Sequence, residues 1–84
     1  MDSIKILWAD DEIDLLKPQL LFLKKKNYEV VTVTNCYDAL EELEENNDFD
    51  IVFLDESMPG ITGLETLAKL KETNPNLPVV MITK

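Results

Sequence analysis

The stretch that most constrains the fold is a run of four apolar residues, Ile51 to Leu54, which ends in the carboxylate of Asp55. A short, uninterrupted apolar run between polar and turn-forming segments is typical of a strand buried on both faces, as in a parallel sheet. In an open sheet of this kind, ligands bind in the crevice outside the carboxyl ends of the strands. Asp55 is therefore predicted to lie where a ligand would bind.

Three more apolar runs alternate with helical patterns along the chain. In addition to residues 51–55, strands are predicted over 4–9, 29–33 and 77–83, and helices over 13–26, 36–45 and 63–73. Strands that alternate with helices through short connections favour right-handed crossovers and a parallel sheet. The chain is therefore predicted to form an α/β domain with a doubly wound parallel sheet. In the order 2-1-3-4, the first and third strands would lie side by side, about 4.8 Å apart.

Local signals indicate how the helices begin and which sides they bury. Pro18 is compatible with the first helix only in or near its first turn, where few amide groups have acceptors within the helix. Asn35 can cap the second helix through its side chain. In the third helix, we expect Leu64, Leu67 and Leu70 to line the buried side, because they recur at three-residue steps.

The composition limits the kinds of function. The 84 residues carry a net charge of −9, which argues against direct contact with nucleic acid or with an anionic membrane. The one cysteine, Cys36, has no cysteine to pair with and no histidine to activate it, so we interpret it as a small packing residue. The sequence has no signal-like or long apolar segment, which is typical of a cytoplasmic protein.

Acidic side chains follow two of the predicted strands. Asp10 and Asp11 come directly after the first strand, and Asp55 ends the third. Because neighbouring parallel strands end at the same edge of a sheet, these carboxylates are expected to meet, and clustered anions repel one another. A Mg²⁺ ion would relieve the repulsion, since it prefers oxygen ligands. Together with the hydroxyl of Thr83 at the end of the fourth strand, the pattern favours phosphoryl transfer to a carboxylate.

These residues resemble the motifs of CheY-like receiver domains of two-component response regulators. The match consists of an acidic pair, an acceptor segment and a strand-ending threonine: Asp10-Asp11, Asp55-x-x-Met58-Pro59-Gly60-x-x-Gly63 and Thr83. The resemblance runs from Ile4 to the end of the chain. Residues 8–12 (WADDE) and 81–84 (MITK) are also similar to PorX-type regulators, which carry a PglZ-like effector domain.

The resemblance implies a fold and a role for each site residue. The fold is the flavodoxin-like sheet, with five strands in the order 2-1-3-4-5. Asp55 would be the phosphoacceptor, supplied by a sensor histidine kinase or a small phosphodonor. Asp11 and Asp55 would hold Mg²⁺ directly, Asp10 partly through water, and Ser57 through its backbone carbonyl. Thr83 would hydrogen-bond a phosphoryl oxygen and shift on activation, and a downstream effector domain in the full-length protein would respond.

The sequence also departs from the family. The family's fifth strand carries a lysine that pairs with the phosphoryl group, and the 84 residues end before such a strand. Lys84 is a poor substitute, because side chains alternate along a strand and Thr83 is predicted to face the site. We therefore expect residues 1–84 to be a receiver domain that is incomplete at its carboxyl end. The apolar strand at 79–82 would then lie at the sheet margin and favour self-association.

Other functions remain open on the sequence alone. A fragment with the receiver fold would also suit a protein-interaction module that works without phosphorylation, which the missing lysine favours. A small Mg²⁺-dependent phosphohydrolase is disfavoured, because no Asp-x-Asp pair follows the first strand. Because the expected chemistry modifies the domain itself, the chain is predicted to be a signalling domain and not an enzyme.

Overall fold

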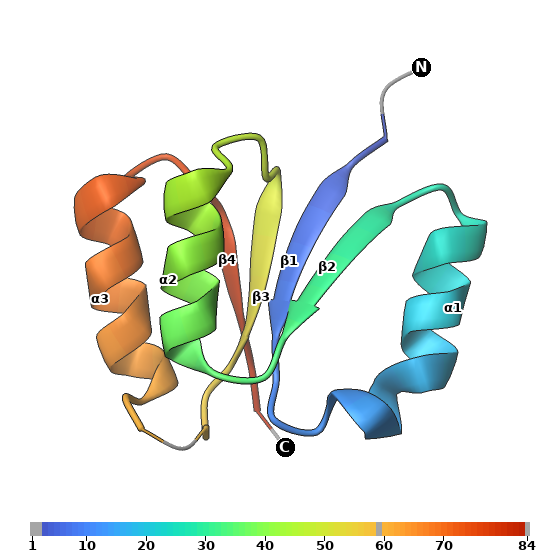
Figure 1. The fold of residues 1–84 in the computed structure, drawn as a ribbon, viewed down its shortest axis with the longest axis horizontal. Coiled ribbons are helices and arrows are strands. Elements are labelled where there is room, and N and C mark those ends of the chain that lie inside the picture. The colour runs from blue at the N-terminus through green and yellow to red at the C-terminus, as the bar shows by residue number, and fades with distance from the viewer. Residues whose placement is uncertain (1–2, 59, 84) are drawn as a thin grey trace.

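The computed structural model describes residues 3–58 and 60–83 (Figure 1). Among these residues, strands alternate with helices in the order predicted from the sequence. The elements are β1 (Lys5–Ala9), the 3-10 helix η1 (Ile13–Leu16), α1 (Lys17–Lys25), β2 (Glu29–Val33), α2 (Cys36–Glu45), β3 (Ile51–Asp55), α3 (Gly63–Thr73) and β4 (Val79–Ile82). The fourth strand is shorter than the predicted 77–83. Within the described ranges, no helix is long and apolar enough to cross a lipid bilayer.

The strands form one parallel sheet in the order β2-β1-β3-β4. β1 pairs with two strands, so that Ala9 at its end lies beside Val33 of β2 and Leu54 of β3. On the far side of β3, Asp55 pairs with Ile82 of β4. The predicted α/β fold with strand order 2-1-3-4 is therefore confirmed, and it brings the carboxyl ends of β1 and β3 to one edge of the sheet.

Helices cover both faces of the sheet (Figure 1). α2 and α3 pack on one face, and α1 lies on the other. The main core, between the sheet and the pair α2 and α3, consists of Leu7, Ala9, Cys36, Ala39, Leu43, Phe49, Val52, Leu54, Met58 and Leu70. Because side chains alternate along a strand, Trp8 and Phe53 face the other side, where their rings meet edge to face with centroids 5.1 Å apart. Both faces of β1 and β3 therefore carry large apolar side chains, as the apolar runs predicted.

Local signals at the first two helices agree with the structure, although the segment predicted as one helix over 13–26 divides into the 3-10 helix η1 (Ile13–Leu16) and α1 (Lys17–Lys25). Pro18 lies in the first turn of α1, so its missing amide donor removes no intrahelical hydrogen bond. Asn35 caps α2, because its side-chain oxygen accepts a hydrogen bond from the Asp38 N–H at 2.9 Å. Both predictions are confirmed.

A capping box fixes the start of α3. The Thr62 hydroxyl accepts from the Glu65 N–H at 3.1 Å, and the Glu65 carboxylate accepts from the Thr62 N–H at 3.3 Å. With this start, the helix buries Gly63, Thr66 and Leu70 against the rest of the protein.

The predicted burial of Leu64 is wrong. Its side chain is 64% exposed, whereas Leu70 is 1% exposed and Leu67 packs partly buried against the core. The buried residues 63, 66 and 70 and the partly buried residue 67 follow the three- and four-residue steps of a helix, and position 64 lies one residue outside that series. The residue at which the helix begins therefore decides which leucines face inward.

Candidate functional site

Asp10 and Asp11 follow β1 directly and differ in their surroundings. Asp10 is 0% exposed, and its N–H donates to the carbonyl of Val33 at 3.0 Å. Its Oδ1 accepts a hydrogen bond from the Glu12 N–H at 2.8 Å. Asp11, by contrast, is exposed. The turn after β1 therefore holds one carboxylate inside the edge of the sheet and the next one at its surface.

Asp55 is the last residue of β3 and is only 2% exposed. Its Oδ1 accepts a hydrogen bond from the Ser57 N–H at 3.1 Å, which orients the carboxylate relative to the loop that follows. The Glu56 N–H donates to the carbonyl of Ile82 at 3.0 Å, which ties the same loop to β4. The position of Asp55 thus depends on the sheet and on both residues after it.

The start of α3 packs tightly on the backbone of Asp55. A methyl group added to Gly63 would lie 2.6 Å from the carbonyl oxygen of Asp55 and 2.9 Å from the Cα of Glu56. Atoms that are not bonded to one another do not approach so closely in a well-packed interior, so this position requires glycine. The sequence motif contains Gly63, but only the structure reveals the close approach as its reason.

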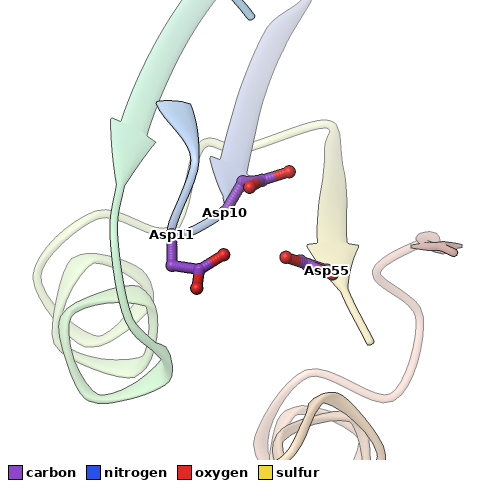
Figure 2. Close-up of side chains that lie close together, drawn as sticks. All are labelled: Asp10, Asp11 and Asp55. Atoms are coloured by element: carbon purple, nitrogen blue, oxygen red, sulfur yellow. The ribbon is translucent and has the colours of Figure 1, made fainter. Parts of the chain in front are cut away.

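The three aspartates meet at the carboxyl end of the sheet. Asp10, Asp11 and Asp55 each offer a carboxylate oxygen, and these oxygens lie within 4.8 Å of one another. Figure 2 shows Asp11 from the turn after β1 and Asp55 from the end of β3 pointing toward each other. The convergence follows from the pairing of β1 with β3, and oxygen ligands from carboxylates suit a hard divalent cation such as Mg²⁺.

A cavity of about 450 Å³ opens beside these carboxylates. Its described lining consists of Asp11, Glu12, Asp55, Glu56, Ser57 and Thr83. A cavity of this size admits a small phosphorylated group together with water. The lining is therefore acidic and includes the hydroxyl-bearing residues Ser57 and Thr83.

The predicted site residues fall into two sets. Asp10, Asp11 and Asp55 are brought together, and Ser57 and Thr83 lie at the same cavity. Two other residues of the predicted motifs, Pro59 and Lys84, lie outside the described residues.

One contact beside the site was not predicted. Gly60 has a φ angle of +87°, and a methyl group added to it would lie 3.2 Å from Cε2 of Tyr37. Tyr37 belongs to the first turn of α2, which is far from Gly60 in the sequence. No periodicity or motif links these positions, because the contact depends on the path of a loop in space.

The structure also accounts for Cys36. Its side chain is buried in the main core, as expected for a packing residue. Burial raises the pKa of its thiol above the ordinary value, because the charged thiolate would lose its hydration. A thiol in this state is a poor nucleophile, which agrees with a packing role.

Comparisons with known proteins match nearly the whole chain to one family. The family model described as "response regulator receiver domain" matches residues 6–84. A CpxR homologue from Haemophilus influenzae, named a transcriptional regulatory protein, is 35% identical over 79 residues. The regulatory protein VanR of Enterococcus faecium is 36% identical over 83 residues. These matches cover 94% and 96% of this chain but only 34% of each relative, so the chain spans about a third of their length.

Solved structures agree with the sequence comparisons. A response regulator receiver domain protein from Clostridium thermocellum has a TM-score of 0.88 and 32% identity, over 95% of this chain and 64% of that protein. The response regulator TrrA of Thermotoga maritima, solved in complex with Mg²⁺ and BeF, has a TM-score of 0.87 and 31% identity, over 96% of this chain and 70% of TrrA. With a family match over residues 6–84 and the same fold as these receiver domains, the chain belongs to the response regulator receiver domain family.

Proposed function

We propose that the domain is a phosphorylation-controlled switch in which Asp55 accepts a phosphoryl group in a Mg²⁺-dependent reaction. The observation that carries this proposal is the convergence of Asp10, Asp11 and Asp55 beside an open cavity. A carboxylate can attack phosphorus as a nucleophile, and Asp55 is the carboxylate that ends a buried strand. Membership of the receiver family supports the same role.

The donor groups fit Mg²⁺ in their chemistry. Three carboxylate oxygens within 4.8 Å of one another suit an ion that is usually held by a few carboxylates and retained waters. We assign Asp11 and Asp55 as direct ligands, Asp10 as a ligand partly through water, and the backbone carbonyl of Ser57 as a further ligand. When bound, the ion supplies positive charge that offsets the charge on the phosphoryl oxygens. The Mg²⁺ complex of the Thermotoga relative supports this assignment.

In the proposed step, a carboxylate oxygen of Asp55 forms a bond to phosphorus while the bond from phosphorus to the leaving atom breaks. With a phosphohistidine donor, the leaving atom is an imidazole nitrogen, which keeps the electron pair and takes a proton from water. With acetyl phosphate, the leaving group is acetate. The protein orients the reacting groups: the Ser57 N–H holds Oδ1 of Asp55, and the Thr83 hydroxyl at the cavity would donate a hydrogen bond to a phosphoryl oxygen.

The partners and location follow from this role. A sensor histidine kinase would supply the phosphoryl group, and an effector domain in the full-length protein would respond to it. The chain covers only 34% of a relative named as a transcriptional regulatory protein, which supports a separate effector region. The net charge of −9 disfavours contact of this domain with nucleic acid or an anionic membrane. We assign it to the cytoplasm as a signalling domain without substrate turnover, and a PorX-type affiliation stays a prediction from the motifs.

Phosphate uptake tests the proposed function directly. The chain is incubated with Mg²⁺ and acetyl phosphate, and its intact mass is measured beside those of Asp55→Asn and Asp50→Asn. The wild type and the Asp50→Asn control are expected to gain one phosphoryl group, and Asp55→Asn none. Uptake by Asp55→Asn equal to that of the wild type would show that another residue is the acceptor. Uptake by no variant would favour the interaction module that works without phosphorylation.

Self-association along β4 is a separate part of the proposal. β4 (Val79–Ile82) pairs with β3 and lies at the margin of the described sheet, and Val80 is 44% exposed there. An apolar edge strand with unpaired backbone groups is a template for pairing with a second chain. Light scattering at rising concentration is expected to show dimers for the wild type and fewer for Val80→Lys. A wild-type chain that stays monomeric at high concentration would contradict this part alone.

A further inference from the structure

We propose that Glu12 and Glu56 set the donor specificity of the site: their carboxylates repel small anionic phosphodonors and so favour a phosphoryl group that a protein presents. Both residues line the cavity beside Asp55, and neither is among the predicted metal ligands. The inference rests on the proposed function, because it concerns the molecule from which Asp55 takes the phosphoryl group.

Glu12 belongs to the turn that follows β1, and hydrogen bonds fix its backbone there. Its N–H donates to Oδ1 of Asp10 at 2.8 Å, and its carbonyl accepts from the Leu15 N–H at 2.9 Å. The side chain itself is exposed. Because both backbone groups are bonded, the charge of Glu12 is carried from a fixed position next to the site aspartates.

Glu56 is fixed in the same way on the other side of the cavity. It follows Asp55 directly, its N–H donates to the Ile82 carbonyl at 3.0 Å, and its carbonyl accepts from the Gly63 N–H at 3.3 Å. These bonds attach its backbone to β4 and to the start of α3. Its side chain is also exposed, so the two glutamates place carboxylates in the wall of the cavity from different segments of the chain.

The two glutamates make an acidic cavity more negative still. Four of its six described lining residues are acidic and none of the six is basic. The three site aspartates already outweigh the two positive charges of a Mg²⁺ ion, so Glu12 and Glu56 add to a negative balance. A cavity of about 450 Å³ is roughly 10 Å across, so a charge on its wall lies within about one screening length of a group inside it at physiological ionic strength.

A small phosphodonor and a protein donor meet this charge differently. A small anion enters by diffusion and has no contact outside the cavity, so the repulsion lowers the rate of its reaction directly. A protein donor contacts the surface around the cavity, and those contacts offset the repulsion, while basic side chains on its surface would pair with the glutamates. The acidic wall therefore discriminates against small anionic donors.

The first test compares initial rates of phosphate uptake at saturating Mg²⁺ and an ionic strength of about 0.15 M, where the screening length is about 8 Å. With acetyl phosphate, a dianion, Glu12→Gln and Glu56→Gln are each expected to react about two- to fivefold faster than the wild type. The gain should be smaller with phosphoramidate, a monoanion at neutral pH, and should disappear in about 1 M salt, where the screening length is about 3 Å. Glu12→Asp and Glu56→Asp, which keep the charge, should not show this gain.

Glu72→Gln is the matched control, because it removes the same charge from an exposed position on α3. Glu72 lies nine residues (72 − 63) beyond Gly63, which is bonded to Glu56, and this is roughly 14 Å along the helix axis. At more than one screening length from the cavity, its charge should not affect the rate. Wild-type rates in both Glu12→Gln and Glu56→Gln would overturn the proposal. An equal gain in Glu72→Gln would also overturn it, because net charge alone would then explain the effect.

The second test measures Mg²⁺ affinity by titration with Trp8 fluorescence and needs no phosphodonor. Trp8 lies two residues before Asp10 and is retained in every variant. A charge that repels an anion attracts a cation, so Glu12→Gln and Glu56→Gln are expected to bind Mg²⁺ about two- to fivefold more weakly, although they react faster once saturated. Unchanged affinity in both variants would overturn the proposal. A loss of about 10-fold or more together with a slower reaction would overturn it too, because the glutamate would then act in metal coordination.

Failure of this inference can be distinguished from failure of the proposed function. If the wild type takes up phosphate at a rate that the glutamine variants do not change, the proposed function stands and only the donor specificity is wrong. If the wild type takes up no phosphate from either donor, the proposed function is contradicted, and this inference with it.

Discussion

Carboxylates cluster at both ends of the paired strands β1 and β3, and the two clusters, called the amino-end group and the carboxyl-end group, differ in their partners. At the amino end, Nζ of Lys5 lies 2.9 Å from Asp48 and 3.9 Å from Glu29, and the Lys5 N–H donates to Asp50 at 2.8 Å. At the carboxyl end, the three site aspartates converge on one another, with oxygens within 4.8 Å (Figure 2). The amino-end group contains a lysine that pairs with its carboxylates, and the carboxyl-end group brings three carboxylates together at one cavity.

Burial separates the two groups further. The side chains of Asp48 and Glu29 are 66% and 61% exposed, whereas Asp10 and Asp55 are 0% and 2% exposed. Exposed carboxylates remain hydrated, and their ion pairs contribute little to stability. Burying several carboxylates together is unfavourable unless their charge is offset. Asp11 is exposed like the amino-end carboxylates, so convergence is the property that all three site aspartates share and that distinguishes them among the 17 acidic residues of the chain.

The largest expected effect is on Mg²⁺ affinity, which should depend on the carboxyl-end group and not on the amino-end group. Asp11→Asn removes a proposed ligand, and we expect Mg²⁺ affinity to fall about 100-fold or more, since losing even an outer partner of a ligand typically costs 10- to 100-fold. Asp48→Asn removes a carboxylate from the amino-end group and should leave the affinity unchanged. Titration with Trp8 fluorescence measures both variants. Equal affinities would mean that the two groups do not differ in metal binding.

A second prediction concerns the close packing of Gly63 on the backbone of Asp55, compared with an exposed position near the amino-end group. Gly63→Ala would place a methyl group 2.6 Å from the Asp55 carbonyl oxygen, so the start of α3 or the end of β3 must shift. We expect urea denaturation to show a loss of about 1–3 kcal/mol, as for an overpacked interior. Asn47→Ala, in the exposed turn before β3, should stay within about 0.5 kcal/mol of the wild type. If Gly63→Ala were as stable as the wild type, the start of α3 could move away from Asp55 without loss of stability.

Removing a buried carboxylate should have opposite effects with and without metal. Two unit charges about 5 Å apart repel by roughly 1–3 kcal/mol over the dielectric range from water to a protein surface. Asp10→Asn keeps an oxygen for the Glu12 N–H but removes one charge, so we expect metal-free protein to gain about 1 kcal/mol. With Mg²⁺ at about 100 times the wild-type Kd, the wild type gains about 2.7 kcal/mol, whereas a variant that no longer binds the ion gains nothing, so the wild type becomes the more stable of the two. Urea denaturation in EDTA and in Mg²⁺ measures the difference in unfolding free energy between Asp10→Asn and the wild type under each condition. A variant that is less stable than the wild type in EDTA would contradict the proposed repulsion between the carboxylates.

The sequence was sufficient for the fold and for the position of the aspartates. Four apolar runs with short helical connections leave few arrangements, and adjacent parallel strands place Asp10 and Asp55 at one edge. The bounds 29–33, 51–55 and 63–73 agree with the structure. These features depend on the periodicity of each segment and on the short connections between segments, and both can be read directly from the sequence.

Contacts that depend on the path of a loop or on a helix start could not be predicted. The exposure of Leu64 follows from the capping box at Thr62, and the approach of Tyr37 to Gly60 follows from how the loop between β3 and α3 passes α2. The amino-end group was missed for the same reason, since Lys5 and Asp48 meet only after β1 and β3 have paired. In each case the partners are distant in the sequence or depend on which residue starts a helix.

The smallest expected effect is on the pH dependence of the amino-end group. The hydrogen bond and charge of Lys5 lower the pKa of Asp48, and the same hydrogen bond raises the pKa of Lys5. The contribution from Asp48 is therefore complete above the unfolded value of about 3.9 and is lost as the pH falls through the lower folded value. The contribution from Lys5 is complete below its unfolded value of about 10.4 and is lost as the pH rises through the higher folded value.

Asp48→Asn should consequently lower the urea midpoint by a small, constant amount between about pH 5 and pH 9. The difference from the wild type should shrink toward zero as the pH falls below the lowered folded pKa of Asp48, where the carboxyl group is protonated in both states. The effect is small because the Asp48 side chain is 66% exposed and solvent screens the pair. Glu44→Gln, an exposed change on α2, serves as the control outside the amino-end group. A difference between variant and wild type that grows as the pH falls would mean that the ion pair of Lys5 and Asp48 is not the source of the stabilisation. The comparison of a solvated ion pair at the amino end with converging carboxylates at the carboxyl end would then fail.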